Sequence, residues 1–191
     1  VKGQSQLISP GAKAVFAYDP STGKEIWTIR YGNHSSAART LVGHEMAFIN
    51  TGYGKAELLG IRIDGKGDVT DTHIVWRLRK GAPNKPSPVL HDGHLYTVTD
   101  GGVASCINPK TGEVIWQARI GGEYSASLLL SKGNIYCFDQ GGTCLVFQAN
   151  PKEFKQVSKS KLDDGFMSSP AVLLNSLILR TKTDLYRIQK R

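Results

Sequence analysis

Two groups of side chains in this sequence have types and spacings that could bind a metal. Asp64, Asp68 and Asp71 lie in a glycine-rich segment, and carboxylate oxygens of this kind suit calcium. Their spacing differs from that of an EF-hand loop and no closing glutamate follows, so we interpret the segment as an exposed acidic loop. His91 and His94 bracket an Asp-Gly pair with no evident third ligand, so we interpret them as turn residues at the surface. We therefore expect no metal site.

The cysteines could carry redox chemistry. The sequence has three of them, which allow one disulfide at most. A hairpin that pairs Phe138 with Thr143 would place Cys137 directly opposite Cys144, close enough for a strained bridge. A bulge in the turn would shift this register by one residue. We therefore prefer two free thiols that pack as small apolar side chains.

The elements that must position these groups come from a repeat. The phrase DPSTGKEIW, Asp19 to Trp27, recurs as NPKTGEVIW, Asn108 to Trp116. Trp76 divides the interval between the other two tryptophans into steps of roughly 40 to 50 residues, the period of propeller blades. In each phrase proline fixes φ, Asn or Asp caps the turn, and Gly23 or Gly112 supplies a positive φ. We assign Trp27, Trp76 and Trp116 to docking between blades.

Each repeat is typical of four short antiparallel strands separated by turn residues. In the best-formed repeat we expect strands at about 87–90, 95–99, 103–107 and 114–119, with Cys106 in the core. The chain is thus predicted to be all-β, a single partial β-propeller of four-stranded antiparallel blades over residues 1–191. The expected blades are 1–32 (partial), 33–81, 82–122, 123–165 and 166–191 (partial).

The tryptophan phrases resemble the repeats of the PQQ-like (quinoprotein-type, tryptophan-docking) β-propeller family. That family includes quinoprotein alcohol dehydrogenases and the periplasmic lipoprotein of the outer-membrane β-barrel assembly machinery. The resemblance runs from about Leu7 to Ile188 and is similar to the C-terminal blades of bacterial PQQ-repeat proteins. In the segment from Asn150 to Phe154 the phrase lacks Thr-Gly and tryptophan, so one docking contact is either absent or filled by Phe154.

The resemblance also indicates how many propeller blades this chain could form compared with a closed ring. Members of the family close rings of seven or eight blades, whereas 191 residues suffice for four to five blades at about 40 residues each. We therefore expect the carboxyl-terminal part of a longer propeller. Its missing blades would come from the same protein or from a second copy of the chain.

Three functions are compatible with the resemblance. The first hypothesis is a noncatalytic scaffold that binds a protein or peptide in the periplasm or outside a bacterial cell. The alternative is part of a dehydrogenase that depends on PQQ and calcium, and a weaker alternative is a sensor or carbohydrate-binding propeller. Quinoprotein dehydrogenases commonly place two adjacent cysteines against PQQ and use a catalytic aspartate. Neither feature is recognisable here, so we expect no cofactor and no catalytic residue.

The loops that do not repeat are the candidates for binding. Loops after the second and fourth strands of each blade gather at one end of a propeller, where partners usually bind. Variety among these loops fits either a binding function or drift. The expected binding face comprises Asn33, His34, Lys85, Glu123, Tyr124, Asp163 and Phe166. Serines of the first strands, among them Ser87, Ser127 and Ser169, we attribute to packing, because no His and Asp accompany them.

The net charge of +8 raises nucleic acid or an anionic membrane as partners. The lysines and arginines are scattered, however, and no aromatic-interleaved basic stripe accompanies them. We expect a solvated basic surface and no nucleic-acid partner. No stretch approaches the roughly 20 consecutive apolar residues of a membrane helix, so no membrane span is expected.

Overall fold

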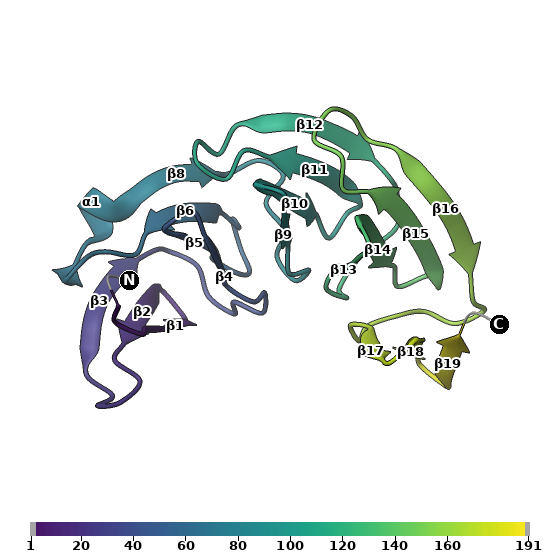
Figure 1. Ribbon diagram of the computed structural model, residues 1–191, viewed down its shortest axis with the longest axis horizontal. Helices are drawn as coiled ribbons and strands as arrows, with labels where there is room; N and C mark the ends of the chain where they lie inside the picture. The colour runs from purple at the N-terminus through teal and green to yellow at the C-terminus, as the bar shows by residue number, and fades with distance from the viewer. Residues whose placement is uncertain (1–2, 190–191) are drawn as a thin grey trace. The chain divides into compact units, whose positions relative to one another are not determined.

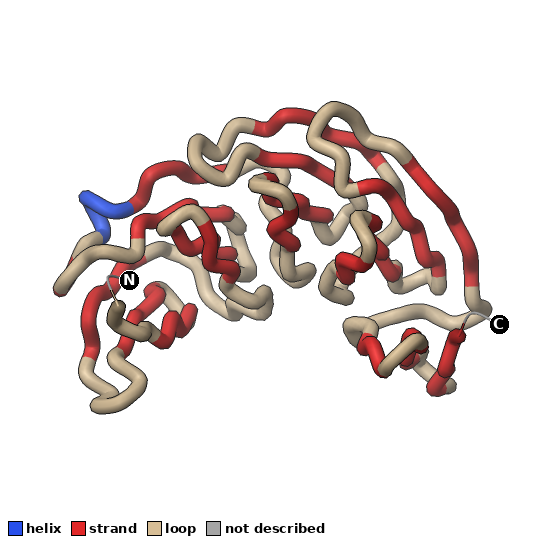
Figure 2. The backbone as a smooth tube through the Cα atoms, viewed as in Figure 1, coloured by secondary structure: helices blue, strands red, loops and turns tan. Residues whose placement is uncertain are grey.

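The computed structural model describes residues 3–189, in which strands and loops alternate and one short helix occurs (Figures 1 and 2). The chain divides into two compact units. The first comprises Val1–Asn84 and Asn108–Glu113, and the second comprises Lys85–Ile107 and Val114–Arg191. Each unit is built from successive sheets in which most strands pair in antiparallel fashion with the next strand of the chain.

The first unit contains two four-stranded sheets. One sheet comprises β1 (Leu7–Pro10), β2 (Ala14–Tyr18), β3 (Glu25–Arg30) and β7 (Gly67–Asp68). The other comprises β4 (Leu41–Gly43), β5 (Met46–Asn50), β6 (Leu58–Arg62) and β8 (Ile74–Leu78). The short strand β7 pairs in parallel with β3, and the helix α1 (Thr70–His73) joins it to β8. The segment between β6 and β8 thus covers the free edge of β3.

The second unit contains two four-stranded sheets and a three-stranded one. The first comprises β9 (Val89–His91), β10 (His94–Val98), β11 (Val103–Ile107) and β12 (Val114–Arg119). The second comprises β13 (Leu129–Ser131), β14 (Asn134–Phe138), β15 (Thr143–Gln148) and β16 (Gln156–Lys161). The third comprises β17 (Ala171–Leu173), β18 (Ser176–Arg180) and β19 (Leu185–Gln189). The strands expected between residues 87 and 119 correspond to β9 to β12, so the predicted four-stranded blade is confirmed.

Local turn chemistry sets these strands. The first two strands of a blade are joined by tight turns whose residues have positive φ, as at Asp92 (45°) and Gly93 (72°), the conformation that matches the twist of a hairpin. In four sheets one strand pair shifts its register by one residue. The pairs are β2 with β3, β6 with β8, β11 with β12 and β15 with β16, and the shift falls, for example, at Cys106/Ile107 and Val146/Phe147. Such bulges increase the local twist of a strand pair.

The core lies between consecutive sheets of the same unit. In the first unit Val15, Trp27 and Ile29 pack against Ile49 and Leu59 of the next sheet. In the second unit one cluster joins the sheets of β9–β12 and β13–β16, and another joins β14 to β18. All five residues of β5 are buried, because apolar side chains cover both faces of its sheet.

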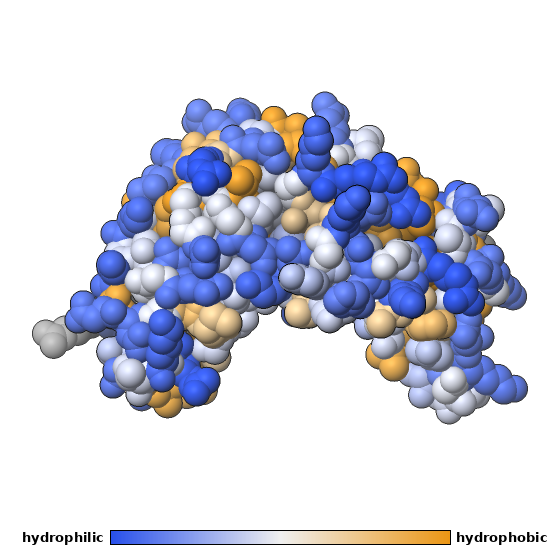
Figure 3. Space-filling model, turned by 180° about the vertical axis from the view of Figure 1, so that it is seen from behind, coloured by the Kyte–Doolittle hydropathy of each residue, from blue (hydrophilic) through white to orange (hydrophobic). Residues whose placement is uncertain are grey.

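The outer surface is mixed. Hydrophilic residues predominate on the face drawn in Figure 3, with apolar patches between them. Within residues 3–189, the structure has no helix with the length and apolar character needed to cross a membrane.

Candidate functional site

The tryptophans of the repeat join neighbouring strands and loops inside each unit. In the first unit Trp76 Nε1 donates to the carbonyl of Pro109 over 2.8 Å, and its ring lies against Gly112. In the second unit Trp116 Nε1 donates to the carbonyl of Asn150 over 2.9 Å. Trp27 is fully buried, and its Nε1 donates to Gln6 Oε1 over 3.1 Å. Two of the three indoles therefore bind the Asn-Pro turn of a later repeat.

The turn residues have the geometry that the phrase predicts. Asn108 Oδ1 accepts a hydrogen bond of 3.0 Å from the backbone N–H of Lys110, and Asp19 Oδ1 accepts one of 2.8 Å from that of Ser21. This bond and one from the Ser21 hydroxyl hold the pKa of Asp19 below its usual range, the hydroxyl being the larger cause. Gly23 and Gly112 have φ of 71° and 74°. The Asp19 and Asn108 side chains and the two glycines therefore stabilise the turns of the repeated phrase.

Phe154 does not replace the missing tryptophan. The partner of Val146 on the fourth strand is Ser158, just as the partner of Cys106 is Trp116. Ser158 is exposed, so the docking contact of this blade is absent. Phe154 lies instead in the preceding loop, with its ring centre 5.7 Å from that of Trp116 in an edge-on arrangement. Phe154 therefore packs against the indole of Trp116, which belongs to the preceding blade.

The acidic segment is engaged in local contacts. Asp68 Oδ1 accepts hydrogen bonds from the hydroxyl and the backbone N–H of Thr70 over 2.6 and 3.1 Å, and its Oδ2 lies 3.1 Å from Arg30 Nε. The Thr70 hydroxyl is the main cause that lowers the pKa of Asp68. Asp71 lies in α1 and is exposed. The segment thus pairs with the edge of β3.

The histidine turn also has local partners. His94 Nδ1 lies 2.8 Å from the carbonyl oxygen of Asp92, and His91 Nε2 lies 3.3 Å from Asp92 Oδ2. Both rings therefore contact the turn that they flank.

The three cysteines are free. Cys137 pairs with Leu145 and Phe138 pairs with Cys144, so the two thiols project from opposite faces of one hairpin. Cys137 lies in the cluster with Tyr96 and Phe147, whereas Cys144 packs beside Phe138 in the next cluster. The direct opposition of Cys137 and Cys144 was wrong by one residue, and the preferred free thiols are what the structure shows. Cys106 is fully buried, as predicted.

The predicted binding face divides into exposed and buried residues. Tyr124 and Phe166 are each 1% exposed, and the Phe166 ring lies 5.2 Å from that of Phe138. The prediction that these two aromatic side chains face a partner is wrong, because they fill the core beneath the loops. Glu123 and Asp163 are exposed, as expected for a binding surface.

The other residues of the predicted face make contacts within their own unit. Asn33 Nδ2 donates to Thr51 Oγ1 over 2.8 Å and to the carbonyl of Lys55 over 2.6 Å, which fixes its loop. His34 is exposed, with its ring centre 5.8 Å from that of Tyr53. In the second unit Lys85 Nζ lies 3.5 Å from Asp100 Oδ1. Of the predicted set, the structure brings only Lys85, Glu123 and Asp163 to exposed loops of the second unit.

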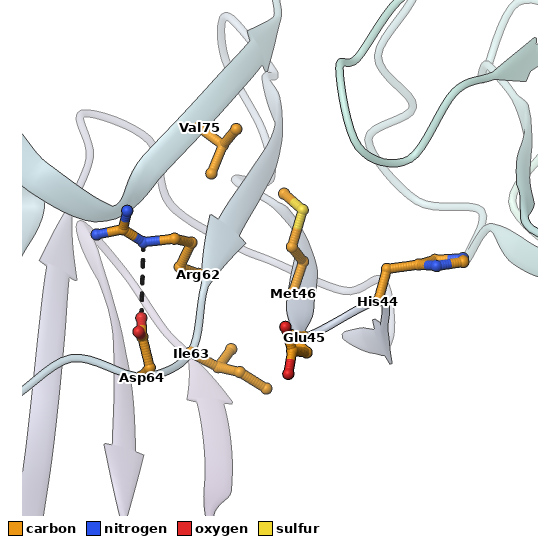
Figure 4. A pocket seen from close by; sticks show the side chains of 7 residues that line it. All are labelled: His44, Glu45, Met46, Arg62, Ile63, Asp64 and Val75. Atoms are coloured by element: carbon orange, nitrogen blue, oxygen red, sulfur yellow. Dashed lines mark ion pairs between the residues drawn. The ribbon is translucent and has the colours of Figure 1, made fainter. Parts of the chain in front are cut away.

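The first unit has a pocket of about 670 Å³ beside the β4–β5 turn and the loop after β6 (Figure 4). It is lined by His44, Glu45, Met46, Arg62, Ile63, Asp64 and Val75. Arg62 points toward Asp64, with Nε 3.6 Å from Oδ1, whereas His44 points away from this pair. The pocket therefore combines apolar walls with an ion pair that is already formed. The sequence singled out only Asp64 of this lining, because the other residues come from strands β5, β6 and β8 and from a turn and carry no shared motif.

The second unit has a pocket of about 530 Å³ between two loops. It is lined by Gly122, Glu123, Asp139, Gln140 and Gly141. Glu123 was predicted as a binding residue, whereas Asp139 was not among the predicted binding residues. Asp139 is 7% exposed, and a bridge in antiparallel register joins it to Tyr124. Its difference from the equivalent residues of other repeats was the sequence signal that could have identified it.

Comparisons with known proteins agree with this fold. BamB from Moraxella catarrhalis has a TM-score of 0.71 at 15% identity, covering 93% of this chain and 51% of that protein. The computationally designed protein Ika8 has a TM-score of 0.69 at 13% identity, with coverages of 95% and 54%. The β-propeller domain of Cps50 (Swd1) from Myceliophteria thermophila has a TM-score of 0.69 at 14% identity, with coverages of 96% and 66%. This chain thus spans between half and two thirds of each structure.

A family model gives the link at the level of sequence. A PQQ-repeat model described as outer membrane protein assembly factor BamB matches residues 65–153, and no curated protein matches the chain. The matched region includes the phrase from Asn108 to Trp116 and the loops around Glu123 and Asp139. The fold is therefore that of a partial β-propeller, and residues 65–153 carry the PQQ-like repeats that the tryptophan phrases predicted.

Proposed function

We propose that the second unit is a noncatalytic scaffold that binds a protein or peptide segment at the end carrying the β10–β11 and β14–β15 turns. The observation that supports this most directly is the pocket of about 530 Å³, whose lining includes Glu123, Asp139 and Gln140, loop residues that differ between repeats. The framework around it consists of repeated turn and docking residues. Binding residues are commonly placed on such loops over a rigid scaffold.

The comparisons support this proposal indirectly. The family model is described as an assembly factor of outer membrane proteins, a role that fits contact with other polypeptides. We place the proposed activity in the bacterial envelope on the same basis. We further propose that this binding requires neither PQQ nor calcium, since the sequence lacks the adjacent cysteine pair that quinoprotein dehydrogenases commonly place against PQQ.

Site-specific crosslinking tests this proposal. A photoreactive amino acid is placed at Glu123, beside the pocket, or at Lys132, an exposed turn residue of β13–β14. The full-length protein is irradiated in the cells that produce it, and the products are identified by mass spectrometry. We expect a discrete protein adduct from position 123 and none from position 132, with the same adduct after PQQ and Ca²⁺ are added. Equal labelling from both positions, or adducts from position 132 alone, would contradict the proposed face.

A further inference from the structure

The residue that directly follows the second strand of a blade, at the start of the turn into the third strand, makes the same hydrogen bonds in successive blades. In four blades its backbone N–H donates across the turn to a carbonyl, over 2.9 Å in each case. The residue that carries this carbonyl also has a backbone N–H, and this N–H donates back to the side-chain oxygen of the recurring residue. The four acceptor–donor pairs are Thr51 Oγ1 with Glu57 N–H (2.9 Å), Thr99 Oγ1 with Val103 N–H (3.0 Å), Asp139 Oδ1 with Thr143 N–H (2.7 Å) and Thr181 Oγ1 with Asp184 N–H (3.0 Å). A hydroxyl is therefore sufficient for this turn.

Asp139 carries a charge that the turn does not require. Its Oδ1 performs the threonine's role and also accepts the N–H of Gly141 over 2.9 Å. Within residues 3–189, no hydrogen bond is made to Oδ2, although the residue is 7% exposed. Burial of a carboxylate is costly unless a counter-charge or hydrogen bonds compensate it. Oδ2 is not one of the buried polar atoms that lack a partner in the described residues, so it is open to the pocket and available to a ligand there.

The neighbouring blade supplies its own counter-charge at the adjacent position. There Lys85 Nζ lies 3.5 Å from Asp100 Oδ1. One repeat later the corresponding residues are Ser125 and Gln140, whose side chains are joined by a neutral hydrogen bond of 2.9 Å. Among the described residues, neither Asp139 nor Glu123 forms an ion pair. A cation for this pair of carboxylates is thus not provided by the blade itself.

The backbone keeps space beside the free oxygen. Gly122 has a φ of 77°, and a Cβ at this residue would lie 2.6 Å from Asp139 Oδ2. Only glycine lets the chain pass so close to the carboxylate in this left-handed conformation. The next residue, Glu123, is exposed and lines the same pocket. The pocket is therefore lined by one buried and one exposed acidic residue.

We infer that this pocket binds the ammonium or guanidinium group of a lysine or arginine side chain from a protein partner. A basic side chain forms charge-assisted hydrogen bonds with a carboxylate, and the pocket of about 530 Å³ accommodates it. A divalent metal fits less well, because no group of three or more His, Cys, Asp or Glu side chains suited to a metal occurs within residues 3–189. The inference rests on the proposed function and names the chemistry of its ligand.

The test uses Asp139→Thr, which installs the residue of the equivalent positions. This variant retains the turn acceptor and removes the charge, so it is expected to fold with a melting temperature equal to or above that of the wild type. Asp139→Asn is the second variant, because it preserves the shape of the carboxylate. Glu153→Gln, an exposed change in the loop after β15, is the matched control for loss of one negative charge.

The probe is a random heptapeptide phage library selected on the immobilised full chain. We expect the wild type and Glu153→Gln to enrich peptides with lysine or arginine, and both Asp139 variants to lose this enrichment. A selected peptide is then synthesised with the basic residue replaced by norleucine or citrulline. Its affinity for the wild type should fall at least tenfold, whereas its affinity for Asp139→Thr should not change.

Other outcomes overturn the inference in distinguishable ways. Selected peptides that bind equally well with neutral replacements would leave peptide binding intact and remove the cationic pocket. Calorimetric binding of CaCl₂ that is lost in Asp139→Thr, without selection of basic peptides, would identify a metal site instead. Selection of no peptide, together with no crosslink from position 123, would contradict both the inference and the proposed function.

Discussion

At the scale of single residues, a glycine and a tryptophan depend on each other. The Trp76 indole lies across Gly112, and a Cβ at Gly112 would come within 2.6 Å of the ring. Gly112 also has a positive φ of 74°, which costs about 1–2 kcal/mol for other residues. The glycine of the repeated phrase thus has two roles in this blade, namely turn geometry and space for the indole.

The variant Gly112→Ala tests this pairing. We expect it to lower the free energy of unfolding by about 2–4 kcal/mol, since backbone strain and overpacking add. Gly23→Ala is the matched control, because Gly23 has a similar φ of 71° and no atom within 4 Å of its Cβ position. Its cost should be near 1 kcal/mol, from the backbone alone. Urea denaturation followed by tryptophan fluorescence measures both, and equal losses would show that the indole contact contributes nothing.

At the scale of elements, serines join the segments that lead into the first strands of successive blades in the second unit. Ser127 Oγ donates to Ser87 Oγ over 2.9 Å and accepts from the backbone N–H of Ser87 over 3.3 Å. The backbone N–H of Ser127 donates to Ser169 Oγ over 2.9 Å. The small residues attributed to packing therefore also link three blades by hydrogen bonds.

Ser127→Ala is expected to destabilise the second unit by about 1–2 kcal/mol, because it removes the hydroxyl between two strands. Ser158→Ala on β16 serves as the control, since Ser158 is exposed and should change the stability by less than about 0.5 kcal/mol. The comparison is made by urea denaturation with Trp116 fluorescence as the probe of this unit. If the two variants have the same midpoint, the hydrogen-bonded serines do not stabilise the sheets.

At the scale of the whole molecule, buried thiols and phenols make stability depend on alkaline pH. Burial raises the pKa of Cys106 and of Cys144 to about 11 and that of Tyr31 to about 12. Above the ordinary thiol pKa of 9.0, the unfolded chain loses protons that the folded chain retains. The folded state then binds more protons than the unfolded state, so the free energy of unfolding falls as pH rises.

We expect stability to be constant between about pH 7 and 8.5 and to fall at higher pH, by at most about 1.4 kcal/mol per pH unit for each group. Urea denaturation at several pH values up to about 10.5 measures this slope. Cys106→Val, which installs the residue of the equivalent position 146, should reduce the slope while preserving the apolar core. A slope that is unchanged in this variant would show that Cys106 does not contribute.

The amino-acid sequence by itself determined the fold class, the blade pattern and the turn geometry. Asp-Gly pairs, the Asn-Pro-x-Thr-Gly phrase and alternating apolar residues act within a few positions of each other, so their effect can be predicted locally. Trp76 could be assigned to blade docking for the same reason, since the Asn-Pro-x-Thr-Gly phrase that it contacts is repeated.

Only the tertiary structure decided which loop side chains are available. Tyr124 and Phe166 are buried because residues from neighbouring strands and sheets cover them, and Cys137 and Cys144 are separated by a register set along the whole hairpin. Asp139 has a second oxygen beyond the one that the turn uses, whereas threonine hydroxyls fill the same place in three other blades. Such contacts join residues distant in the sequence, and local patterns carry no information about them.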